Sequence, residues 1–306
     1  MLRCIVIAFV IFIHDNAKAR DANAAFVREI APGVYAHQGA VALMNAENRG
    51  DIANIGFVVG EKCVAVIDAG GSLEVGRALL AALRQITDKP ICFVVNTHVH
   101  PDHIFGDGAF VAPGVTFVGH KNLPRALAQR GAFYKKSFRP MIGALADEAV
   151  IVTPTLTVDG ERTLDLGGRA LTVRSWRTAH TDNDVSVFDT ASGVIFTGDL
   201  VFLRHTPVVD GSLLGFLSVV GDLEKIPAKL AVPGHGPIGV DWPAALQAEK
   251  TYLETLTKDL RRLVKSGERV DRAAQEAAQS EKSKWSLFDD YNPRNATAGF
   301  AELEWE

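Results

Sequence analysis

The sequence predicts an α/β protein in which strands and helices alternate along the chain. Short apolar segments rich in β-branched residues are typical of strands at 33–37, 55–59, 63–67 and 91–96. Between the last two, residues 73–86 carry apolar side chains at helical spacing and end before a proline turn. With 306 residues and 47% hydrophobic content, the chain can bury a multilayered core. One domain over 20–306 is the simplest organisation.

Metal-ligand residues are concentrated directly after the apolar segment 91–96. His98, His100, Asp102 and His103 fall within six consecutive residues of a chain that has only 9 histidines. Imidazole and carboxylate groups bind Zn²⁺, Mn²⁺ or Fe²⁺, and in so short a run they can serve two adjacent ions. A polar surface loop with clustered histidines is the alternative, but chance rarely produces this run. The pattern therefore predicts a metal site at the carboxyl end of a strand, where α/β proteins collect their chemistry.

Further candidate ligands follow other apolar segments. Asp68 closes the segment 63–67, and three more residues each follow a strand-like run, namely His180, Asp199 and His235. Two neighbouring cations repel each other, so a shared anionic ligand such as Asp199 would make a pair of ions tolerable. Each metal-binding imidazole also needs a partner on its second nitrogen. Asp68 and Asp184 are candidates for that role, and the alternative for each is the capping of a loop or a place in a solvated turn.

These motifs, in this order, resemble the metallo-β-lactamase-fold hydrolase superfamily from about residue 34 to residue 242. The resemblance implies an αββα sandwich, two mixed β-sheets flanked by helices. It also implies two Zn²⁺ ions, with Fe or Mn as alternatives. One metal would be held by His98, His100 and His180, the second by Asp102, His103 and His235, and Asp199 would bridge them. Asp102 would also hold and orient the nucleophile.

The N-terminus has the form of a secretory signal peptide. A short basic start precedes an apolar run from Cys4 to Ile13, and Ala17-Lys18-Ala19 offers a cleavage site. Because the apolar run is too short to span a bilayer, we expect cleavage after residue 19, a periplasmic or secreted protein and no stable membrane anchor. Cys63 and Cys92 remain in strand-like segments, where a buried free thiol is the default and a disulfide is the alternative.

Two stretches are not explained by metal binding. Residues 121–148 form a predicted helical insertion that mixes basic and aromatic side chains, which suits either an anionic substrate or an ordinary solvated face. Residues 200–221 contain several glycines that permit a loop beside the metals. In that loop His205 and Arg204 are candidate substrate contacts, and His205 could also relay protons, although an isolated histidine is more often structural.

The C-terminal segment, about 243–306, is predicted to be a helical extension. Its ending, the leader and the loop Asp210-Gly211-Ser212 are similar to SoxH-like proteins, the quinoprotein relay system zinc metallohydrolases. This resemblance implies a link to a quinoprotein dehydrogenase or a c-type cytochrome system. It does not imply a particular substrate.

The leading functional hypothesis is a hydrolase in which hydroxide attacks an ester, thioester, lactone or amide carbonyl of a small molecule. A β-lactamase is the runner-up within the same chemistry. An iron-dependent oxidoreductase and a non-catalytic accessory of quinoprotein electron transfer are alternatives of other classes. The formal net charge of −4 argues against nucleic acid as a partner.

Overall fold

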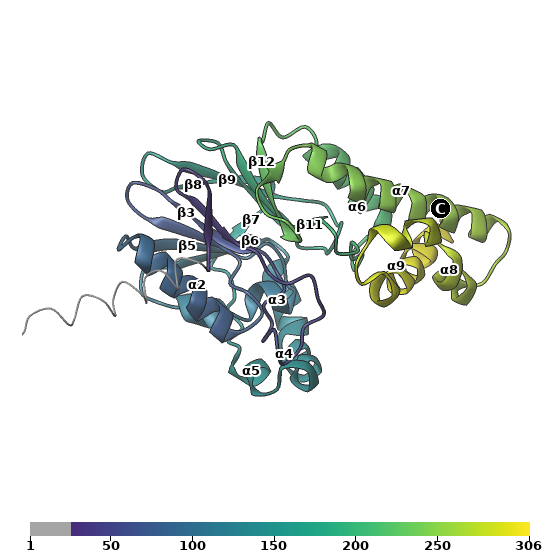
Figure 1. The fold of residues 1–306 in the computed structure, drawn as a ribbon, viewed down its shortest axis with the longest axis horizontal. Helices are drawn as coiled ribbons and strands as arrows, with labels where there is room; N and C mark the ends of the chain where they lie inside the picture. Colours follow the sequence, from purple (N-terminus) through teal and green to yellow (C-terminus); the bar gives the residue numbers. More distant parts are fainter. Residues whose placement is uncertain (1–25) are drawn as a thin grey trace, which may run out of the picture.

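The computed structural model describes residues 26–306, which form two β-sheets with helices on both outer faces (Figure 1). The signal peptide expected at 1–19 lies outside the described residues. The order of layers is helix, sheet, sheet, helix, so the predicted αββα arrangement with two mixed sheets is confirmed. Within residues 26–306 no helix is both long and apolar enough to cross a membrane.

The first sheet has seven strands in sequence order, antiparallel from β1 to β4 and parallel from β4 to β7. Its strands are β1 (Arg28–Ala31), β2 (Val34–His37), β3 (Ile55–Val59), β4 (Val64–Ile67), β5 (Ile91–Val95), β6 (Thr116–His120) and β7 (Leu156–Val158).

The second sheet has six strands in the order β13-β12-β11-β10-β9-β8. All its pairs are antiparallel except β11 with β12. Its strands are β8 (Glu161–Asp165), β9 (Ala170–Ser175), β10 (Val185–Asp189), β11 (Val194–Phe202), β12 (Leu230–His235) and β13 (Val240–Asp241).

The helices fall into three groups by position. Helix α2 (Leu73–Ile86) covers the first sheet and has the predicted bounds; it begins where the Ser72 side chain accepts a hydrogen bond from the Val75 N–H. Short helix α3 (Pro101–Ile104) carries metal-ligand candidates, and α4 (Leu123–Ile142) with α5 (Ala144–Glu148) forms the predicted helical insertion. The rest lie beside the second sheet: α6 (Leu213–Leu223), α7 (Gln247–Lys265), α8 (Val270–Glu276) and α9 (Phe288–Leu303). Three 3₁₀ helices complete the set: Asp107–Phe110, Ala244–Leu246 and Gln279–Lys284.

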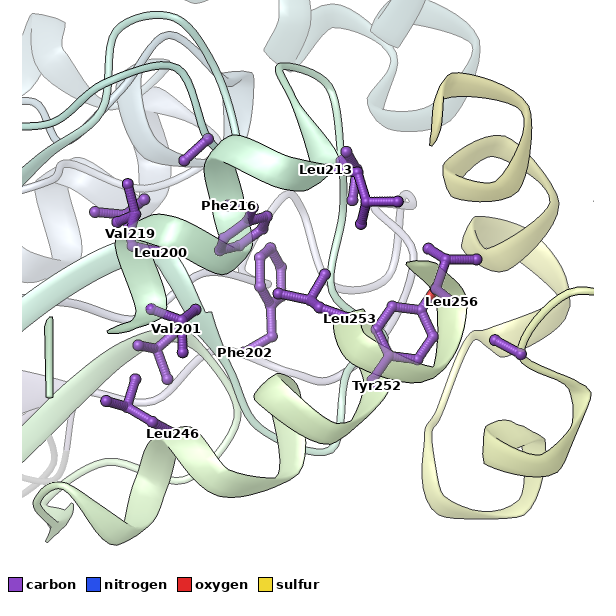
Figure 2. Packing of buried hydrophobic residues seen from close by; sticks show 14 of the residues in the cluster. Leu200, Val201, Phe202, Leu213, Phe216, Val219, Leu246, Tyr252, Leu253 and Leu256 are labelled. Carbon is purple, nitrogen blue, oxygen red and sulfur yellow. The ribbon is translucent and has the colours of Figure 1, made fainter. Parts of the chain in front are cut away.

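Alternation along the strands creates the layers. In β4, Val64 and Val66 pack against α2, while Ala65 and Ile67 join the core between the two sheets. Outside the second sheet, Phe202 of β11 and Phe216 of α6 pack with helix α7 and α9 in a separate apolar cluster (Figure 2). The helices that cover 243–306 are thus joined to the second sheet by a continuous buried core. The organisation of 20–306 as one domain stays a prediction.

Two sequence expectations need correction. The segment 200–221 is not mainly a loop, because β11 continues to Phe202 and α6 begins at Leu213, so that only residues 203–212 connect them. Hydrophobic burial explains both elements, since every residue of β11 is buried and α6 buries one apolar face, with Leu213, Phe216 and Val220.

Cys63 and Cys92 are not free thiols but form a disulfide, with Cα atoms 5.8 Å apart. Neighbouring parallel strands often hold cysteines in unsuitable register. Here Val64 pairs with Ile91 and Ala65 with Phe93, so Cys92 is an extra residue in β5 and the irregularity brings it to Cys63.

We predict that replacing both cysteines, Cys63→Ala with Cys92→Ala, lowers the free energy of unfolding by about 3 kcal/mol. The bond joins residues 29 apart in sequence and restricts the unfolded chain over that span. Urea unfolding followed by circular dichroism would measure the change. A reducing agent should bring the wild-type protein to the level of the variant and leave the variant unaffected; equal stability of the reduced and oxidised wild type would contradict the prediction.

Candidate metal centre and cleft

The predicted ligands meet at one edge of the sandwich, where strands of both sheets end. His98, His100, Asp102 and His103 follow β5 in the first sheet, the last two within α3. The second sheet supplies His180 from the loop between β9 and β10, Asp199 from within β11, and His235 at the end of β12. Two groups result, each with its ligand atoms within 4.8 Å of one another: His98, His100, His180 and Asp199; and Asp102, His103 and His235.

In the first group, three imidazole nitrogens converge on one point. His100 Nδ1 lies 3.1 Å from His98 Nε2 and 2.8 Å from His180 Nε2. In the second group, Asp102 Oδ2 lies 3.3 Å from His235 Nε2 and 3.7 Å from His103 Nε2.

The carboxylate of Asp199 lies between the two groups. Its Oδ2 faces the first, at 3.4 Å from His180 Nε2 and 3.8 Å from His98 Nε2. Its Oδ1 faces the second, at 3.1 Å from His103 Nε2 and 3.4 Å from His235 Nε2. Gly234 makes room for it, because a Cβ at that position would lie 1.9 Å from Asp199 Oδ1.

The outer nitrogens of the five histidines all contact oxygen atoms that can accept a hydrogen bond. Two contact backbone carbonyls: His180 Nδ1 lies 2.7 Å from Val208 O and His235 Nδ1 lies 2.9 Å from Ile52 O. One contacts a hydroxyl, with His98 Nδ1 at 3.0 Å from Thr97 Oγ1. The other two contact carboxylates, His103 Nδ1 at 2.8 Å from Asp68 and His100 Nε2 at 3.0 Å from Asp210.

These contacts fix the tautomer of each ring. Carbonyl and carboxylate oxygens only accept, and the Thr97 hydroxyl already donates to Asp68, so each outer nitrogen must carry the proton. In the neutral form of each ring, the inner nitrogen is then a bare lone pair that points at another lone pair or at a carboxylate. Such an arrangement needs a cation, either a proton or a metal ion, between its members.

Two orphaned atoms support the same conclusion. His103 Nε2 and Asp199 Oδ1 lie 3.1 Å apart without making a hydrogen bond, and both are buried and have no other hydrogen-bond partner. A buried polar atom without a partner is costly, and both atoms belong to the set that a second ion would contact. The residues therefore fit two metal ions and form a dinuclear metal-binding His/Asp site.

Burial and charge set the protonation of the site. Burial and the charge of His103 hold the pKa of His98 well below its ordinary value, and burial lowers the pKa of His180 to about 4, so both rings are neutral at pH 7. Burial alone would lower the pKa of His235, but the charges of Asp199 and Asp102 and the hydrogen bonds with both carboxylates together outweigh it and raise that pKa to about 9. Because a metal ion must displace a proton there, metal affinity is expected to fall as the pH decreases.

Asp68 holds two ligands in place from behind. Its Oδ2 accepts hydrogen bonds from His103 Nδ1 at 2.8 Å and from the Thr97 hydroxyl at 2.8 Å, and Thr97 in turn contacts His98. The Thr97 N–H donates to Oδ1 at 2.7 Å. Asp68 adopts a left-handed backbone conformation, φ 56°, which costs energy and aims its side chain at the ligands.

Asp184 does not partner an imidazole, contrary to the sequence expectation. Its carboxylate accepts hydrogen bonds from the N–H and hydroxyl of Thr181, at 2.8 and 2.6 Å, and so closes the turn after His180. The carboxylate that does partner a ligand of the first group is Asp210. Sequence reasoning missed it, because Asp210 lies 110 residues from His100 and nothing in the sequence distinguishes it from Asp184.

A cleft of about 590 Å³ opens over the metal ligands. One wall is apolar and comes from the segment before β3 and from α4, namely Leu43, Met44, Ile52, Phe133, Phe138 and Met141. The opposite wall contains polar side chains of the loop 203–212 and α9, namely His205, Asp210, Asp290, Tyr291 and Arg294. A hollow of about 620 Å³ on the second sheet contains none of the metal ligands.

Only one of the two predicted substrate contacts faces this cleft. His205 lines it, with its ring centre 4.8 Å from that of His235 and 4.9 Å from that of Tyr291. Arg204 does not line the cleft; its side chain is exposed and its carbonyl accepts a hydrogen bond from the Ser286 N–H. Tyr291 and Arg294 were missed as site residues, since they lie more than 50 residues beyond His235 in a segment that carries no metal ligand.

Known proteins share this fold. The metallo-beta-lactamase superfamily profile matches residues 48–235. The sec-alkylsulfatase Pisa1 from Pseudomonas sp. superposes over 90% of this chain and 50% of its own, at a TM-score of 0.71 and 16% identity. A metallo-beta-lactamase from Pontibacter korlensis superposes over 74% of this chain and 98% of its own, at 0.60 and 23% identity.

One curated relative is similar over a short segment. A linear primary-alkylsulfatase from Pseudomonas sp. (strain ATCC 19151) is 51% identical over 47 residues, which are 15% of this chain and 9% of the relative. The chain thus spans half the length of the sec-alkylsulfatase, and its match to the curated linear primary-alkylsulfatase covers 9% of that relative. The matched residues include all seven metal-ligand candidates, and the chain therefore belongs to the metallo-β-lactamase superfamily and carries a His/Asp metal site.

Proposed function

We propose that the protein is a two-zinc hydrolase that cleaves an ester bond in a small amphipathic substrate. The observation that carries the proposal is the set of five imidazoles whose outer nitrogens contact hydrogen-bond acceptors and whose inner nitrogens gather around Asp199. Nitrogen-rich ligand sets with a bridging carboxylate suit Zn²⁺, with Fe and Mn as the alternative ions.

Bound zinc would supply Lewis acidity, which lowers the pKa of water and stabilises negative charge that develops at the scissile group. The chain itself contributes Asp102, which lines the cleft and contacts His235. Burial would raise the pKa of Asp102, but the charge of His103 and the hydrogen bond with His235 lower it, so the carboxylate stays ionised and can orient a water molecule. His205 lies beside this group, where it can contact the substrate.

An alkyl sulfate is the first candidate substrate. Two relatives are alkylsulfatases, one of them similar in fold over 90% of this chain. The apolar wall of Phe133, Phe138 and Met141 would accommodate an alkyl chain, and the metals would bind the sulfate end.

Carbonyl compounds are the second candidate class, as expected from the sequence: an ester, thioester, lactone or amide, with a β-lactam as a special case. The likeness to a metallo-beta-lactamase favours this class. An iron-dependent oxidoreductase that uses a single ion is a weaker alternative, since both ligand groups are complete, and a non-catalytic accessory is weaker because an open cleft lies over them.

We also propose that the protein acts in the periplasm or is secreted. The leader-like N-terminus supports this location, and so does the Cys63–Cys92 disulfide, because disulfides persist in oxidising compartments. Service to a quinoprotein dehydrogenase or c-type cytochrome system rests on the SoxH-like resemblance alone.

We expect zinc-loaded protein to hydrolyse alkyl sulfates, with kcat/KM increasing with chain length as more methylene groups contact the apolar wall. Each added contact is worth up to about 0.8 kcal/mol, roughly fourfold in kcat/KM. A panel of alkyl sulfates, lactones, thioesters and cephalosporins, with metal content measured in parallel, tests this. Turnover of the carbonyl compounds alone would transfer the proposal to the second class, and no turnover of any compound by fully loaded protein would reject it.

Asp199→Ala is expected to lower the metal content and to abolish most activity, because the variant loses a ligand of both ions and the anion that screens their repulsion. His205→Ala is the comparison: it removes a ring that lines the same cleft and lies 4.8 Å from His235, but no ligand. It should keep both metals and change turnover or substrate preference. The metal content and turnover of both variants test this expectation. An Asp199→Ala protein with two metals and near-native turnover would show that Asp199 is not a bridging ligand.

Asp210→Ala is expected to weaken zinc binding by about tenfold to a hundredfold, since it removes the acceptor that orients His100. Asp210→Asn retains an acceptor oxygen without the charge and should lose less. Competition with a chromophoric chelator measures the affinity without turnover. The matched control is Asp290→Ala, which removes another carboxylate of the same cleft wall and should leave the affinity unchanged.

A further inference from the structure

Exposed apolar side chains are concentrated at the mouth of the cleft. Phe133 is 64% exposed, Met141 47% and Leu43 43%, and all three line the cleft. The other large exposed apolar residues within 26–306 do not line it; these are Val111, Val150, Val270 and Trp305. Apolar side chains gathered on one surface indicate contact with an apolar partner. We call Leu43, Phe133 and Met141 the apolar rim.

Helix α4, which supplies two of the three rim residues, has a charge opposite to that of the whole protein. The chain has a net charge of −4, yet α4 contains five basic residues and no acidic one: Arg125, Arg130, Lys135, Lys136 and Arg139. In Figure 1 this helix lies with α5 at the lower edge of the molecule, away from the C-terminal helices.

Part of this charge is compensated and part is not. Arg125 pairs with Asp182 at 2.5 Å and Arg139 with Asp147 at 3.2 Å. Among the described residues, Arg130 and Lys136 have no carboxylate within ion-pair distance. They lie three residues before and three after Phe133, and residues at that spacing are neighbours on a helix surface. The most exposed rim residue is therefore flanked by two uncompensated cations.

We propose that the apolar rim and these cations dock the protein on the surface of an anionic phospholipid bilayer. Helices with apolar side chains flanked by Lys and Arg bind such surfaces through both the buried apolar area and the attraction to anionic headgroups. Docking would turn the mouth of the cleft toward the membrane, from which an amphipathic molecule could enter it. This inference goes beyond the proposed function and does not depend on turnover.

A membrane suits this surface better than a protein partner. A stable protein interface needs about 800 Å² on each side, with apolar contacts over a continuous area. The rim instead consists of three side chains from two segments that surround an opening, a pattern that allows separate insertion into a lipid surface. The positive charge on α4 selects anionic headgroups over neutral ones.

Sedimentation of the full, zinc-loaded chain with vesicles tests the proposal. We expect binding to phosphatidylglycerol–phosphatidylcholine vesicles that is about tenfold tighter than binding to phosphatidylcholine alone, and that weakens with added salt. The apolar leader could bind vesicles by itself, so the comparison between variants in the same full chain is decisive.

Two pairs of variants separate rim binding from general effects. Phe133→Ser should reduce affinity for the anionic vesicles by about tenfold, whereas Trp305→Ser, which removes an aromatic side chain that is 88% exposed elsewhere, should not. Lys136→Glu should reduce it by about tenfold or more, whereas Lys258→Glu makes the same charge change on the exposed side of α7 and should have little effect.

The proposal would be overturned if each variant and its control lost the same affinity for the anionic vesicles. Equal binding of the wild-type protein to both kinds of vesicle would also overturn it. So would vesicle binding that is unchanged in Phe133→Ser while the KM for long-chain substrates rises, because the rim would then be only a site for the substrate's chain. Failure of the enzyme to hydrolyse any ester would leave vesicle binding unaffected, so the two proposals fail separately.

Discussion

The buried carboxylate of Asp199 is the group on which the rest of the site depends. Five imidazoles and the Asp102 carboxylate surround it, and the contacts of its two oxygens are divided between the two ligand groups. Two cations held in the adjacent ligand groups would repel each other strongly in a buried site, and an anion between them offsets that repulsion. A neutral side chain at this position could bind neither group's ion with comparable strength.

The two sheets are joined through this site as well as through their apolar core. Asp68 and the ligands after β5 belong to the first sheet, while His180, Asp199 and His235 belong to the second. The outer contacts cross between them: His235 of the second sheet contacts Ile52 O in the segment before β3 of the first. Metal binding is therefore expected to stabilise the packing of one sheet on the other, because each ion draws ligands from both.

The sequence was sufficient to predict what local chemistry dictates. The seven ligand positions could be identified because each is a metal-binding residue type at the end of an apolar segment of the sequence or a few residues after it. The bounds of α2 were predictable because an apolar stripe and a proline turn agree. Partner choice was not predictable. Asp184 and Asp210 are both acids in loops near a ligand, and only the path of the chain shows that the first closes a turn and the second reaches His100.

The disulfide illustrates the same limit in a different way. Whether two cysteines on adjacent strands can pair depends on register, and the register here contains an irregularity at Cys92 that no periodicity in the sequence reveals. Long-range placement likewise hid Tyr291 and Arg294, whose approach to the metals follows from the packing of α9.

Helix α9 does more than line the cleft. Asn295 is buried; its amide donates to Pro207 O at 2.6 Å and accepts from the Val209 N–H at 2.9 Å, and so it holds the loop 203–212 on both sides of Val208. Glu302 accepts hydrogen bonds from Ser212 and Leu213 at the end of the same loop. This loop supplies the outer partners of His100 and His180, so the C-terminal helix stabilises the orientation of two metal ligands that lie far from it in sequence. Because the superfamily profile ends at residue 235, the part of the chain that matches it supplies the ligands, and the segment beyond it supports them and forms part of one wall of the cleft.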